Sequence, residues 1–132
     1  MAVVAKGLEG IIANSTAISD VRGDIGQLIY AGYDINELAG KASFEEIIHL
    51  LWHGELPTQT QLDELTAKLR AQRSLPQGVI DFLRTAPKDA SPMDVIRTGV
   101  SLLGLHDRET GPEADHNRAI NITAKIGVIA AV

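Results

Sequence analysis

The stretch SFEEIIHLLWHGELPT, residues 43–58, contains the start, the body and the end of one helix. Ser43 and Glu46 have the spacing of a capping box, in which each side chain binds a backbone N–H group of the first turn. Gly54 readily takes the left-handed conformation that ends a helix. The apolar residues at helical spacing are Phe44, Ile47, Ile48 and Leu51. The pattern predicts a helix over residues 44–53 with a buried face.

The same stretch holds two histidines, His49 and His53, four residues apart, so a helix brings them to one side. A histidine pair can hold an ion, but structural zinc needs further ligands, and the glutamate of an HExxH motif is absent. Glu45 lies about 12 Å from His53 along the helix axis, too far to share one ion. We predict packing or hydrogen-bonded histidines, and no metal site.

Residues on both sides of this stretch predict a mainly α fold with a small N-terminal β-hairpin. The turn sequence RGDIG between two short apolar runs favours a hairpin at about residues 15–31. Thr58 with Gln61 repeats the capping box, and Ser91-Pro92 is a typical helix start. The expected helices cover residues 35–40, 44–53, 59–73, 77–84, 92–105 and 113–132. We expect a single domain over residues 1–132.

Composition narrows the possible partners. The 132 residues carry a net charge of −5, and the 12 basic residues are scattered, which argues against a nucleic-acid partner. No apolar stretch approaches the length of a membrane span, so we expect no membrane partner. The chain has no cysteine, and its first residues are a poor signal peptide. These features favour a cytoplasmic protein.

A second candidate site is a group of acidic residues before the last helix. Its members are Asp107, Glu109, Glu113 and Asp115. A solvated loop explains them better than a cation site does. The tripeptide Arg22-Gly23-Asp24 is turn chemistry rather than a recognition motif. No nucleophile with a base, and no pair of carboxylates in an apolar setting, can be identified.

The last two expected helices are apolar on more than one side, although a domain of this size can cover only one such face. An uncovered apolar face is typical of an interface. The residues expected at an interface between copies of the chain are Met93, Ile96, Val100, Leu103, Ile122, Ile126 and Ile129. We therefore expect a homodimer or higher homo-oligomer formed through these two helices.

The order of segments resembles the amino-terminal part of citrate synthases, particularly the shorter bacterial and archaeal type. The resemblance begins at KGLEGIIANSTAISDVRGDIGQLIYAGYDINELAGKASFEEIIHLLWHGELPT and continues through LPQGVIDFLRTAP, SPMDVIRTGVSLLG and ITAKIGVIAAV. It implies a fragment of the helical large domain, and dimerisation through packed antiparallel helices from this part of the chain. Ser91 stands where the family usually has a histidine, and Ala31 stands where many relatives have arginine.

The resemblance also implies the activity of the full-length enzyme. An aspartate removes a proton from the methyl group of acetyl-CoA while a histidine stabilises the enol. The enol attacks oxaloacetate, and hydrolysis gives citrate and CoA, a step of the tricarboxylic acid cycle. The two catalytic histidines and the aspartate lie beyond the matched region, so none is expected here, and no substrate-binding residue is assigned. No cofactor is implied, since acetyl-CoA is a substrate.

Two other interpretations stay open: a fragment of 2-methylcitrate synthase, and a non-enzymatic helical interaction module. A complete module should end its last helix with a cap or a polar tail. The sequence stops at GVIAAV, without either. This favours a chain whose missing C-terminal part belongs to the same enzyme, so we predict that the chain alone is inactive.

Overall fold

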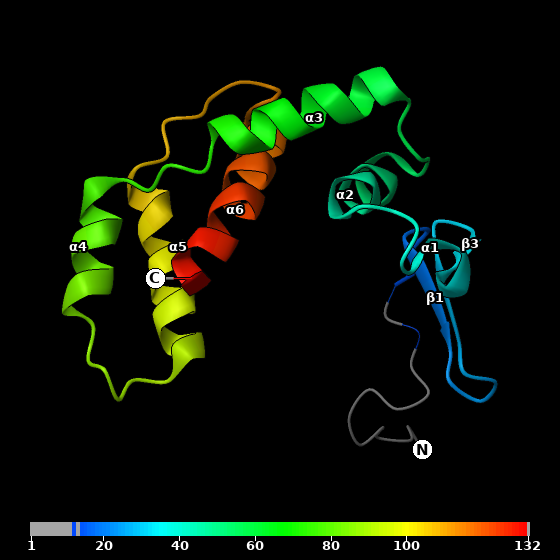
Figure 1. Ribbon diagram of the computed structural model, residues 1–132, viewed down its shortest axis with the longest axis horizontal. Helices are drawn as coiled ribbons and strands as arrows, with labels where there is room; N and C mark the ends of the chain where they lie inside the picture. The colour runs from blue at the N-terminus through cyan, green and yellow to red at the C-terminus, as the bar shows by residue number, and fades with distance from the viewer. Residues whose placement is uncertain (1–11, 13, 132) are drawn as a thin grey trace, which may run out of the picture. The chain divides into compact units, whose positions relative to one another are not determined.

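A computed structural model describes residues 12 and 14–131 of the chain. It is mainly helical, with one small antiparallel sheet, as predicted (Figure 1). The chain forms two compact units, residues 1–62 and 63–132, and their boundary falls inside helix α3 (Gln59–Ala71). A single domain over residues 1–132 stays a prediction. The Gly-Leu-x-Gly segment at residues 7–10 and Val132 lie outside the described residues.

The first unit contains a sheet of order β1-β2-β3. Its strands are β1 (Ser19–Arg22), β2 (Gln27–Tyr30) and β3 (Tyr33–Asp34). Strands β1 and β2 form the expected hairpin, but β3 was not predicted. It pairs Tyr33 with Tyr30 across the two-residue turn Ala31-Gly32, where φ is 45° and 93°. Positive φ at both central residues is the geometry of a tight hairpin turn. Alanine rarely adopts positive φ, so an alanine at this position does not predict the turn from the sequence.

Two helices follow in this unit, α1 (Ile35–Leu38) and α2 (Phe44–His53). Helix α1 is shorter than the expected residues 35–40, and Gly40 follows it with φ 74°. Helix α2 has the expected bounds. The Ser43 hydroxyl accepts from the backbone N–H of Glu46, whose carboxylate accepts from that of Ser43, so the capping box is present. Gly54 ends the helix in the left-handed conformation.

The buried face of α2 differs from the expected stripe. Phe44 is 69% exposed, whereas Ile48, His49 and Leu50 are buried. Ile47 and Leu51 are half-buried. The buried residues are consecutive, so this helix is covered around a broad arc rather than along one narrow line. Periodicity identified the helix correctly but assigned Phe44 to the wrong side.

The second unit contains most of α3 and the three helices α4 (Gln77–Thr85), α5 (Pro92–Leu105) and α6 (Ala114–Ala131). Figure 1 shows α5 between α4 and α6, with its neighbours packed against it. The core is formed by Val79, Leu103 and Ile129, one from each of these helices. Gly99 of α5 is also buried, facing Ile129. Among the described residues, no helix has the length and apolar character to cross a membrane.

Candidate functional site

The histidine pair lies on the last turns of α2. His49 is only 6% exposed, and its Nδ1 atom lies 3.0 Å from the backbone carbonyl oxygen of Glu55. The His53 ring lies beside it, with 4.4 Å between ring centroids and 42° between ring planes. His49 is therefore a hydrogen-bonded packing residue. No group of three His, Cys, Asp or Glu residues in the described part of the chain could hold a metal ion.

The acidic loop before α6 is organised by a residue that the sequence analysis missed, Arg118. Its Nε atom donates to Asp107, its Nη1 atom donates to Asp115 at 3.0 Å, and its Nη2 atom donates to the Glu109 carbonyl oxygen at 2.9 Å. Asn117 adds a hydrogen bond to the Glu109 carboxylate. Two of the four carboxylates, those of Asp107 and Asp115, thus bind a guanidinium rather than line an empty cation site. The spacing of Asp115 and Arg118, three residues apart on a helix, was the available signal.

These contacts change the acid–base properties of the pair. The hydrogen bond from Arg118, together with one from the Glu109 backbone N–H, lowers the pKa of Asp107. The hydrogen bonds to Asp107 and Asp115 raise the pKa of Arg118. Both residues therefore stay charged at neutral pH and hold the loop on α6. Glu113 is exposed, and its backbone carbonyl accepts from the Asn117 N–H at the start of α6.

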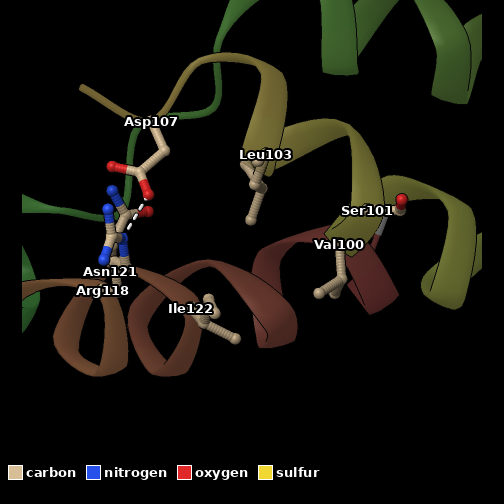
Figure 2. Close-up of a pocket in the computed structure, with 8 residues that line it drawn as sticks. Val100, Ser101, Leu103, Asp107, Arg118, Asn121 and Ile122 are labelled. Carbon is tan, nitrogen blue, oxygen red and sulfur yellow. Dashed lines mark hydrogen bonds and ion pairs between the residues drawn. The ribbon is translucent and has the colours of Figure 1, made fainter. Parts of the chain in front are cut away.

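A cavity of about 230 Å³ lies between α5 and α6 next to this ion pair. Its lining residues are Val100, Ser101, Leu103, Gly104, Asp107, Arg118, Asn121 and Ile122. In Figure 2 the side chains of Val100, Leu103 and Ile122 occupy the space between the helices, while Asp107 and Arg118 meet at one end. The charged end is already neutralised internally, so the accessible part of the cavity is mainly apolar. Its chemistry suits helix packing better than catalysis.

The seven residues expected at an interface fall into two groups. Leu103 and Ile129 belong to the core of their own unit, and Ile96 and Val100 pack against that core. Leu103 and Ile129 are buried there, whereas Ile96 and Val100 are half-buried. The accessible members are Met93, 68% exposed, and Ile122 and Ile126, each 42% exposed. The interface of seven residues stays a prediction, and these three leave the most apolar surface accessible.

Two further positions bear on function. Ser91 occupies the N-cap of α5, but its side chain makes no capping hydrogen bond. Lys125 on α6 is 5% exposed, and its Nζ atom lies 3.5 Å from the Gln72 side-chain oxygen. Desolvation by burial lowers the pKa of Lys125. The hydrogen-bond partner of Lys125 is thus a neutral amide.

The family model described as "Citrate synthase, C-terminal domain" matches residues 7–132. The 2-methylcitrate synthase 2 of Corynebacterium glutamicum is 46% identical over 121 residues, which are 91% of this chain and 32% of that protein. The citrate synthase of Haloferax volcanii is 44% identical over 128 residues, covering 92% of this chain and 34% of that protein. The crystal structure of citrate synthase from Thermotoga maritima superimposes with a TM-score of 0.84 at 32% identity, covering 98% of this chain and 34% of that one.

The fold and these relatives define a citrate-synthase-type transferase as the parent protein. The chain belongs to the citrate synthase family. It spans about a third of the length of the relatives that it matches. The resemblance read from the sequence is confirmed, and the interpretation as a module without an enzymatic parent loses its support. The position of the segment along the parent enzyme stays a prediction.

Proposed function

We propose that this chain is the amino-terminal scaffold of a citrate synthase that condenses acetyl-CoA with oxaloacetate to give citrate and CoA. The family match over residues 7–132 carries the proposal. The reaction would belong to the tricarboxylic acid cycle and would need no cofactor. An acidic chain without cysteine fits a cytoplasmic enzyme. In this proposal the scaffold supplies helices, and the rest of the enzyme supplies the chemistry.

The side chains of the described residues support the proposal that the rest of the enzyme supplies the catalytic groups. The buried polar residues there are His49 and Lys125, and they lie in different compact units. His49 is hydrogen-bonded to the Glu55 carbonyl, and Lys125 has the Gln72 amide oxygen as its partner. A general base must lie within hydrogen-bond reach of the proton that it removes from a bound substrate. Neither residue has that setting, so the chain alone should not catalyse the condensation.

The main alternative within this proposal is a different acyl-CoA substrate for the parent enzyme. The relatives include both a 2-methylcitrate synthase at 46% identity and a citrate synthase at 44% identity, so similarity does not separate the two activities. The two reactions differ by one methyl group on the acyl-CoA, which a hydrophobic pocket discriminates by about 10–200-fold. The parent enzyme should be assayed for oxaloacetate-dependent CoA release from acetyl-CoA and propionyl-CoA. We expect a preference for acetyl-CoA. A preference for propionyl-CoA would instead identify the product of the parent enzyme as 2-methylcitrate.

We also propose that a second copy of the chain packs on α5 and α6. The exposed side chains of Met93, Ile122 and Ile126 support it, since each leaves apolar surface in water. The resemblance to citrate synthases supports an interface through the same helices. The contact would form a homodimer or part of a higher homo-oligomer. It would not change the packing of the core residues Leu103 and Ile129.

A further inference from the structure

The histidine pair of α2 has a feature that the citrate synthase assignment does not use. The Nδ1 atom of His49 lies 3.0 Å from the Glu55 carbonyl oxygen, and a carbonyl oxygen only accepts hydrogen bonds. In the neutral ring, Nδ1 therefore carries the proton and Nε2 carries the free electron pair. Histidines that bind metals commonly donate their other N–H to a backbone carbonyl in this way. The hydrogen bond to Glu55 thus fixes the tautomer that a metal ion requires.

His53 stands one helical turn further along, close enough to share an ion. The two ring centroids are 4.4 Å apart, and the rings are tilted by 42° rather than stacked. His53 is exposed, which leaves room for water molecules around a bound ion. An imidazole ring has two nitrogen atoms, so His53 can keep another interaction and still bind a metal through one of them.

The sequence predicted no metal site at this pair, but two histidines with a fixed tautomer can hold an exchangeable ion. We therefore propose, against that prediction, that His49 and His53 form a two-ligand site for a divalent transition-metal ion, best filled by copper(II). Imidazole nitrogen suits this class of ion, and affinity along the first-row series is highest for copper(II). No group of three metal-binding side chains occurs in the described residues, so water completes the coordination. The bound ion would therefore exchange readily with ions in solution. This separates the histidine pair from a structural zinc site, in which the protein supplies all four ligands.

The test is copper(II) titration of the 132-residue chain, purified without a histidine tag, with electron paramagnetic resonance at one equivalent. The spectrum should show superhyperfine coupling to two imidazole nitrogens. His53→Ala changes an exposed residue, so the fold should survive, and the spectrum should then show one nitrogen with affinity at least about tenfold lower. His106→Ala and His116→Ala, which alter histidines of the other unit, should change neither property. Equal copper affinity for the unchanged chain and the His53→Ala chain would overturn the proposal.

Discussion

Gly99 on α5 lies so close to Ile129 on α6 that a Cβ atom at position 99 would sit 3.0 Å from the Ile129 Cγ2 atom. A Cβ contact of 3.0 Å is tighter than nine in ten real ones, so a side chain at position 99 would require Ile129 to shift by a few tenths of an ångström. Ile129 is 2% exposed and belongs to the core with Val79 and Leu103. This contact therefore marks a close approach of the two helices that we propose for self-association.

Replacing Gly99 by valine should destabilise the chain. Extra carbon atoms in a well-packed core typically cost about 1–3 kcal/mol, which outweighs the small gain in helix propensity. Gly104 provides a matched control on the same helix, because a Cβ there meets nothing within 4 Å. Gly104→Val should change the free energy of unfolding by only a few tenths of a kcal/mol, or about 0.5 at most. Urea unfolding of both variants gives the two free energies of unfolding. An equal decrease in both variants would contradict a close approach of α5 and α6 at Gly99.

The ion pair of Asp107 and Arg118 predicts a pH dependence. Its hydrogen bonds lower the pKa of Asp107 in the folded chain, whereas the unfolded value is about 3.9. The stabilisation is therefore complete well above that value and is lost as the pH falls through it toward the lower folded pKa. Between pH 6 and pH 3 the unchanged chain should lose more stability than Asp107→Asn. Asp89→Asn, in the segment between α4 and α5, controls for the change in net charge.

The two serines that precede helices make a matched pair. Ser43 caps α2 with its hydroxyl, whereas Ser91 at the N-cap of α5 makes no side-chain capping bond. Ser43→Ala should cost about 0.5–2 kcal/mol of stability, the usual range for a lost cap. Ser91→Ala should cost much less, since no capping hydrogen bond is removed. Thermal unfolding of the two variants under one buffer condition compares them, and a larger loss for Ser91→Ala would refute the assignment of the caps.

Self-association through α5 and α6 predicts a position-specific effect of charge. Ile126→Asp places a carboxylate at the proposed contact, where burying an unpaired charge is strongly unfavourable. Ile25 is 67% exposed in the other compact unit, so Ile25→Asp is the control. Sedimentation equilibrium at high micromolar concentration should find the unchanged chain and Ile25→Asp associated, and Ile126→Asp at the 14.1 kDa of the monomer. A monomeric unchanged chain would remove this part of the proposal.

Local signals in the sequence predicted much of the fold. The capping boxes at Ser43 and Thr58 are both formed, because cap chemistry depends on residues only three positions apart. Strand β3 was missed because its turn uses Ala31 at positive φ, which no residue preference indicates. The exposure of Phe44 depends on how segments pack, and periodicity alone does not contain that information.

The candidate site was less predictable than the fold. Arg118 gathers Asp107, Asp115 and the Glu109 carbonyl, yet Asp107 lies eleven residues away along the chain. The acidic residues were visible in the sequence, but the residue that neutralises them depends on how the loop returns to α6. An apolar stripe does not reveal whether its partner is the same chain or another. Leu103 and Ile129 were predicted at an interface from such a stripe, and the structure shows that they belong to the core of their own unit. Their place at an interface stays a prediction.

The most direct test of the central claim is a thiol-release assay of the pure 132-residue chain with acetyl-CoA and oxaloacetate. If the chain is a scaffold segment of a citrate synthase, CoA release should equal that of the control without protein, because we identify no group placed to enolise the thioester among residues 12 and 14–131. The full-length parent, assayed in parallel, should release CoA only when oxaloacetate is present. Reproducible oxaloacetate-dependent CoA release by the 132-residue chain alone would contradict the account.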